Sequence, residues 1–76
     1  MENNMEADKM FEELGYEKKT EIIENNNLTT IKYNKQNKYE IIFRIDTKET
    51  IIEGFKGIEI EELQAINKKC EELGWI

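Results

Sequence analysis

Apolar residues recur at helical spacing near both ends of the chain and at alternate positions between them. The first stripe has the i, i+3, i+4, i+7 spacing of an amphipathic helix and comprises Ala7, Met10, Phe11 and Leu14. The second stripe comprises Leu63, Ile66, Cys70 and Leu73. These patterns predict helices over about residues 2–14 and 60–73, with Glu59 as a candidate N-cap of the second.

The middle of the chain has the period of two that is typical of β-strands. In "KYEIIFRID" one face carries Tyr39, Ile41, Phe43 and Ile45. Strands are predicted at about residues 18–24, 28–34, 38–45 and 50–56, of which the first has the weakest pattern. The sequence therefore predicts a single α+β domain over residues 1–76: an N-terminal helix, a three- or four-stranded antiparallel meander and a C-terminal helix.

Two nearly identical segments, "EELGY" at residues 12–16 and "EELGW" at residues 71–75, close the two helical patterns. Glycine adopts the left-handed conformation that ends many helices, and the residue after it commonly packs back onto the last turn. The repeat therefore predicts two helix ends of the same kind. It is not evidence for a repeated binding element.

The alternation also leaves apolar residues on the second face of the predicted sheet. If both helices cover the face that carries Phe43, then Ile23, Ile42 and Ile52 are expected on the opposite face. Contiguous exposed apolar patches usually mark interaction sites. We hypothesise that these isoleucines contact a second copy of the protein or a target protein.

Charge changes this picture by limiting the class of partner. The net charge is −6, and it is concentrated at the ends: residues 1–15 carry −4, residues 16–57 carry +1 and residues 58–76 carry −3. DNA binding depends on clustered lysine and arginine, so direct nucleic-acid binding is not expected. Aromatic residues interleaved with bases could form a single-strand stacking platform, but strand alternation accounts for them better. A basic protein partner fits the charge.

No set of residues indicates an active site. Histidine is absent, and Cys70, the single cysteine, falls in an apolar stripe, where a buried structural role is expected. We therefore expect no enzyme activity, no cofactor and no metal. Adjacent helical carboxylates point about 100° apart and do not face one another. They are either solvated helix surface or an acidic surface that imitates nucleic acid toward a basic partner: Glu12, Glu13, Glu61, Glu62, Glu71 and Glu72.

The compartment follows from similar observations. No apolar run exceeds three residues, the start is acidic, and one cysteine cannot form an internal disulfide. We expect no membrane association and a cytoplasmic location.

Three segments, "FEELGYEK", "YEIIF" and "IEIEELQAINKKCEELGW", resemble small uncharacterised proteins encoded by phages and prophages of low-GC Gram-positive bacteria. The similarity spans most of residues 10–75 and is strongest in the last helix, although Glu59 stands where such proteins usually carry threonine. The resemblance implies a phage setting and a fold, and it brings no known active site. Small acidic phage proteins often disable host factors, including nucleases of defence systems.

The first functional hypothesis is therefore a non-enzymatic phage-type accessory protein that binds and inhibits a host protein, with a nucleic-acid-binding defence factor as the sharper form. The second is a dimeric module that sequesters a small molecule such as a nucleotide beside Tyr33, Tyr39, Arg44 and Lys56. The third is a minor structural or assembly component of a phage particle.

Overall fold

Two helices and four strands form the described part of the protein. A computed structural model describes residues 6–24, 27–54 and 57–76, and it describes their side chains except those of residues 20–29. In chain order the elements are α1 (Glu6–Glu13), β1 (Glu17–Glu24), β2 (Asn27–Lys35), β3 (Tyr39–Arg44), β4 (Glu49–Glu53) and α2 (Ile60–Glu72). The predicted α+β class, with a strand meander between two helices, is confirmed.

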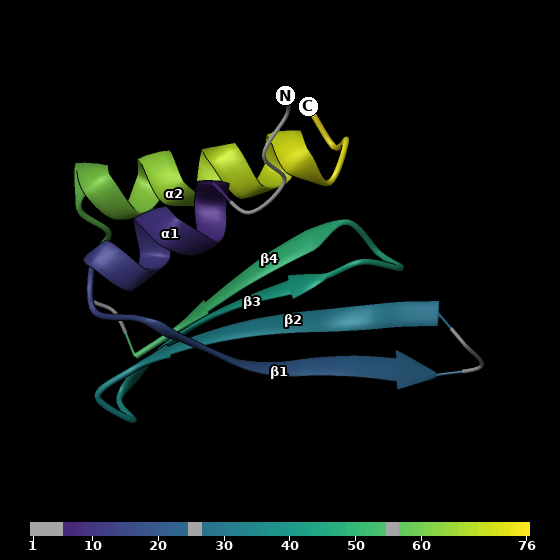
Figure 1. Ribbon diagram of the computed structural model, residues 1–76, viewed down its shortest axis with the longest axis horizontal. Helices are drawn as coiled ribbons and strands as arrows, with labels where there is room; N and C mark the ends of the chain where they lie inside the picture. Colours follow the sequence, from purple (N-terminus) through teal and green to yellow (C-terminus); the bar gives the residue numbers. More distant parts are fainter. Residues whose placement is uncertain (1–5, 25–26, 55–56) are drawn as a thin grey trace.

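The four strands form one antiparallel sheet in the order β1-β2-β3-β4. Figure 1 shows α1 and α2 side by side on one face of this sheet, which gives a two-layer arrangement. The turn between β2 and β3 has positive φ angles at Gln36 (58°) and Asn37 (54°), and the Lys38 N–H donates to the Lys35 carbonyl at 3.0 Å. Two positive φ angles match the right-handed twist of a hairpin, so this polar turn sets the β2–β3 register.

Both helices end in the same hydrogen-bonded structure, as the repeated segment predicts. At the end of α1 the Tyr16 N–H donates to the Phe11 carbonyl at 2.9 Å, across Gly15 with φ 95°. At the end of α2 the Trp75 N–H donates to the Cys70 carbonyl at 2.9 Å, across Gly74 with φ 78°. These bonds define two Schellman motifs. The aromatic residues after each glycine therefore belong to the fold.

The core lies between the sheet and the helices and is centred on three aromatic rings. Phe11 of α1 stacks on Tyr33 of β2 with ring centroids 4.2 Å apart, and Phe43 of β3 meets Tyr33 edge-on at 5.8 Å. Such pairs contribute about 0.5–1.5 kcal/mol beyond the burial of their area. Ile41 and Phe43 are fully buried and Tyr39 and Ile45 pack against them, so the predicted inward row of β3 is confirmed.

The predicted inward stripe of α2 is partly wrong. Ile66 is buried and Cys70 and Leu73 pack against the core, but Leu63 is 51% exposed. The residues of α2 that are buried follow the i, i+3, i+4, i+7 spacing from a different start: Glu62, Ala65, Ile66 and Lys69. The helix is thus rotated relative to its apolar stripe, because two charged side chains find partners inside the protein.

Candidate interaction surfaces

The six glutamates predicted to form an acidic surface divide into two groups. Four of them are exposed on the helical layer: Glu12, Glu13, Glu61 and Glu71. Glu62 is buried, and the Glu72 side chain is only 4% exposed. The expectation that Glu62 and Glu72 contribute to a solvated acidic surface is therefore wrong.

Glu62 is buried because two donors lie within its reach. Its Oε1 accepts from the Glu59 N–H at 2.9 Å, and its Oε2 accepts from the Tyr16 hydroxyl at 2.9 Å. The first bond belongs to the N-terminus of α2, where Glu59 has the extended conformation of an N-cap. Burial raises the pKa of Tyr16 above its usual value, and the hydrogen bond to Glu62 raises it further.

Glu72 joins the two helices. Its Oε2 accepts from the Ala7 N–H at 2.9 Å, so it occupies the first turn of α1, where backbone donors lack helical partners. Its Oε1 lies 3.9 Å from the Lys69 Nζ. A carboxylate near the end of α2 therefore accepts a hydrogen bond from a backbone N–H in the first turn of α1.

Lys69 lies at the centre of the polar contacts between α1, α2 and the sheet. Its side chain is 7% exposed, its Nζ lies 3.4 Å from the Asp8 Oδ1, and it also stands over the Tyr33 ring. Asp8 in turn accepts from the Tyr33 hydroxyl and lies 3.3 Å from the Lys18 Nζ. Two carboxylates thus flank one buried ammonium group, which is the condition under which a charge can be buried without a large penalty.

The surroundings of Asp8 set its ionisation. Burial by itself would raise the pKa of Asp8, but the Tyr33 hydroxyl and the ammonium groups of Lys69 and Lys18 stabilise the carboxylate and hold the pKa below its ordinary value of 3.8. All these contacts link structural elements to each other. We therefore call this set of residues the fold-holding cluster: Asp8, Lys69 and Glu72. Its contacts join residues 61 to 65 positions apart in the chain, so they could not be predicted from local sequence patterns.

The uncovered face of the sheet carries a different pair of described isoleucines from the predicted one. Ile42 pairs with Ile51 of β4 across the β3–β4 ladder, whereas Ile52 pairs with the buried Ile41. Directly opposed residues share a face, so Ile52 lies on the helix-covered side and Ile51 takes its place beside Ile42. This corrects the prediction for Ile52. The Ile23 side chain lies outside the described residues, and its backbone pairs with Leu28.

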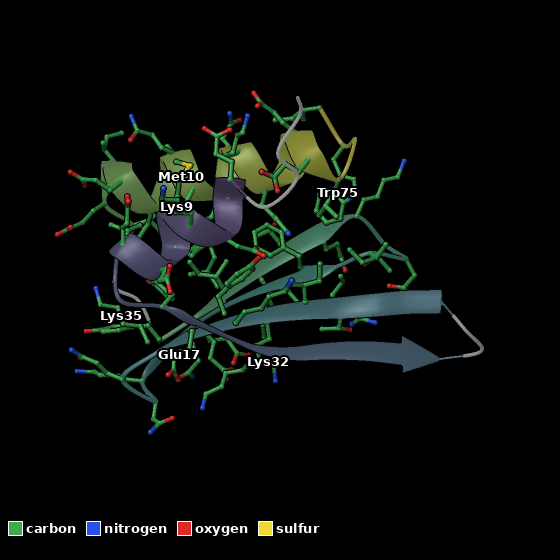
Figure 2. The ribbon with its side chains drawn as sticks, viewed as in Figure 1. Lys9, Met10, Glu17, Lys32, Lys35 and Trp75 are labelled. Carbon is green, nitrogen blue, oxygen red and sulfur yellow. The ribbon has the colours of Figure 1, made fainter. Side chains whose placement is uncertain are left out.

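Charged residues border the pair formed by Ile42 and Ile51. Lys32 lies directly opposite Ile42 on β2, and it extends from the sheet on the side away from the helices (Figure 2). The adjacent rungs of this face place Arg44 beside Glu49 and Glu40 beside Glu53. Both isoleucines are only partly exposed. Among the described side chains this face is therefore a small apolar centre in a mixed-charge surround.

The residues proposed to form a nucleotide pocket do not converge. Tyr33 is 1% exposed, and its hydroxyl is bonded to Asp8. Arg44 is exposed and lies one position from Phe43 along β3, on the opposite face of the sheet from Tyr33. Lys56 lies outside the described residues. Tyr39 is half-buried, with the Lys38 Nζ 5.4 Å from its ring centre. Because Tyr33 and Arg44 point to different faces, they cannot line one cavity.

The helical layer carries exposed apolar residues, one of which, Leu63, was predicted to face the core. Ile60 is 61% exposed and Leu63 is 51% exposed, and they are neighbours on α2 at i, i+3 spacing. Beside them an open groove runs between the two helices, lined by Glu6, Met10, Leu63, Gln64, Asn67 and Lys68. Figure 2 shows Met10 extending from α1 toward α2. If Glu62 and Lys69 had been predicted to point inward, this side of α2 would have been predicted to be exposed. Nothing in the local sequence indicates that these two charged residues are buried.

The described residues also bear on metal centres, membrane spans and the cysteine. Within the described ranges no three side chains of the metal-ligating kind lie close enough to hold an ion, and no helix has the length and apolar character needed to cross a membrane. Cys70 is partly buried and packs against the core. In comparisons with protein-family models, curated proteins and solved structures, no match to this chain was found.

Proposed function

We propose that this protein is a non-enzymatic accessory protein of the phage type that binds and inhibits a basic host protein through its helical layer. The observation that carries the proposal is the coexistence of exposed acidic and exposed apolar side chains on that layer. Glu13 and Glu61 are exposed there, as are Ile60 and Leu63. The two kinds of residue have different effects in binding.

Acidic residues act at a distance. A cluster of like charge raises the rate at which a partner of opposite charge is encountered and suppresses partners of the same charge. Apolar residues act on contact, because their burial supplies most of the affinity once the partner is docked. A surface that combines both is suited to a basic protein with an accessible apolar residue.

The sharper form of the proposal is an inhibitor of a host defence protein that binds nucleic acid. The groove of such a protein is rich in lysine and arginine. Exposed carboxylates on a rigid two-helix layer would compete with phosphates for these side chains. The support for this form is the acidic character of both helices and the resemblance of the sequence to small phage proteins.

A matched pair of charge reversals tests the proposal. The variant Glu13→Lys/Glu61→Lys changes the helical layer, and Glu49→Lys/Glu53→Lys changes β4 by the same net charge. We expect tagged wild-type protein to co-purify with a basic host protein in stoichiometric amount and to block its binding or cleavage of nucleic acid. The helical variant should lose both effects by roughly tenfold or more, about 1.4 kcal/mol, while the β4 variant keeps them.

Other results of the same assays would contradict the proposed contact surface or the proposed function. An equal loss in both variants would show that net charge alone matters and that the helical layer is not the contact. Capture of an acidic protein, or no inhibition by the wild type of any captured protein, would contradict the proposed function itself.

A further inference from the structure

Exposed apolar residues gather in a short segment around the start of α2. Of the large hydrophobic residues recorded as exposed in the described part of the chain, three lie between residues 58 and 63: Ile58, Ile60 and Leu63. Leu63 also lines the groove between the helices, together with Met10 of α1. The groove therefore has apolar side chains from both helices, although its other lining residues are polar.

Leu63 is not exposed because of a gap in the core. The inward side of α2 is already filled by Glu62, Ala65, Ile66 and Lys69. A rotation of α2 that buried Leu63 would have to bring Lys69 and Glu62 away from Asp8 and Tyr16, their partners at 3.4 and 2.9 Å. Breaking such buried polar contacts costs more than burying one leucine returns. Leu63 is consequently held on the surface.

Charge distinguishes between two possible occupants of the groove. The groove lining carries one acid and one base, Glu6 and Lys68. Three further acids stand three or four positions from lining residues on the same helices, and one base is next to Met10 in sequence, which leaves a net charge of −2 on and around the groove: Glu13, Glu61, Glu71 and Lys9. Lys68 is already paired with Glu6 at 3.2 Å and with Glu71 at 3.7 Å. A second copy would bring the same negative surface and a total charge of −6 against it. A basic segment meets complementary charge instead.

We propose that the α1–α2 groove, with Ile60 and Leu63 at its border, binds a segment of the partner protein that carries a large apolar side chain flanked by lysine or arginine. The apolar side chain enters between Met10 and Leu63, and the flanking bases reach Glu13 and Glu61. This inference rests on the proposed function and specifies the recognition element of the partner.

Selection from a library of displayed random peptides tests the inference with a defined probe. Peptides enriched on the wild-type protein are expected to share one large apolar residue next to lysine or arginine. The affinity of the best synthetic peptide is then measured by fluorescence anisotropy. Ile60→Ser and Leu63→Ser should each weaken binding by roughly tenfold, the size expected for an interface anchor. Ile76→Ser, which alters another exposed isoleucine, should leave the affinity within about twofold.

Each other outcome counts against the inference. Enriched peptides without the apolar and basic pattern, or no enrichment, would overturn it, as would equal binding by the serine variants, whose folding is checked by circular dichroism. If basic peptides bind and only Glu13→Lys/Glu61→Lys weakens them, the groove is excluded while the proposed function stands. If no basic peptide and no basic host protein binds, both proposals fail.

Discussion

Individual charged residues in this protein have different roles that depend on what surrounds them. Glu61 and Glu62 are adjacent in sequence, yet Glu61 is exposed and Glu62 is buried against Tyr16. Lys68 and Lys69 differ in the same way, since only Lys69 faces Asp8 inside the protein. The 100° between successive helical positions is enough to separate a solvated charge from one that holds the fold.

Asp8 is the residue whose ionisation we expect to be visible in stability. Its folded pKa lies below 3.8 because Tyr33, Lys69 and Lys18 stabilise the carboxylate. A lowered pKa stabilises the folded state above the unfolded pKa, and this contribution is lost as the pH falls through the folded value. We predict that Asp8→Asn lowers the free energy of unfolding by about 1–3 kcal/mol at pH 7, because Lys69 then keeps only one of the two carboxylates that flank it in the described structure.

Urea denaturation at several pH values measures this. The difference in the free energy of unfolding between wild type and Asp8→Asn should be constant from pH 7 to about pH 5 and should narrow at lower pH. Glu17→Gln is the control, because the ion pair that Glu17 forms with Lys19 among the described residues is exposed, and its substitution should change stability by less than about 0.5 kcal/mol. A difference that does not vary with pH would show that Asp8 contributes only by packing.

At the scale of elements, short local features decide where helices and strands end and how the sheet is joined. Gly15 and Gly74 end the helices in the same Schellman geometry, and the Lys35–Lys38 turn sets the β2–β3 hairpin. The edge strand β4 ends differently: Gly54 has φ 86°, and it passes close to the backbone of Lys38 at the start of β3. The backbones of Gly54 and Lys38 are therefore packed closely against each other at this end of the sheet.

Gly54 and Gly57 give a matched test of that close packing. A Cβ on Gly54 would lie 2.1 Å from the Lys38 carbonyl oxygen, in a backbone conformation that L-residues rarely adopt, whereas a Cβ on Gly57 would meet nothing within 4 Å. We predict that Gly54→Ala costs about 2–4 kcal/mol of stability and that Gly57→Ala changes it by less than about 0.5 kcal/mol. Thermal unfolding followed by circular dichroism compares them, and equal melting temperatures would refute the role assigned to Gly54.

The whole molecule has two layers and two different outer surfaces. The helical layer is acidic with apolar residues at the groove, and the sheet face combines Ile42 and Ile51 with bordering bases and acids. At neutral pH a net charge of −6 makes copies repel one another. The homodimer through the sheet face stays a prediction. Because the described apolar centre of that face is small, we expect the association of two copies to depend strongly on their net charge.

Light scattering against pH tests that sensitivity. Near the isoelectric point of 4.7 the net repulsion vanishes, while the lowered pKa of Asp8 keeps its carboxylate charged beside Lys69. We predict greater self-association at pH 4.7 than at pH 7, and a reduction by Ile42→Ser/Ile51→Ser but not by Ile76→Ser. If the double variant associates as strongly as the wild type, the sheet face is not the surface through which copies meet.

The sequence by itself determined the order and type of the elements. Helical and alternating periods are local properties, and so are the glycine stops after Leu14 and Leu73, because each depends on residues within one or two turns. The inward row of β3 followed from alternation alone. Four of the glutamates predicted for the acidic surface are exposed, and their role in binding stays a prediction: Glu12, Glu13, Glu61 and Glu71.

Only the tertiary structure decided which side of β4 and which side of α2 face inward. The four residues between Arg44 and Glu49 set the pairing of β4, and a shift of one residue would have exchanged Ile51 and Ile52 between the faces. The rotation of α2 depended on Tyr16 and Asp8, which are far away in sequence and hold Glu62 and Lys69 inside. That rotation placed Leu63 on the surface, because polar contacts between distant elements outweighed the apolar periodicity of a single helix.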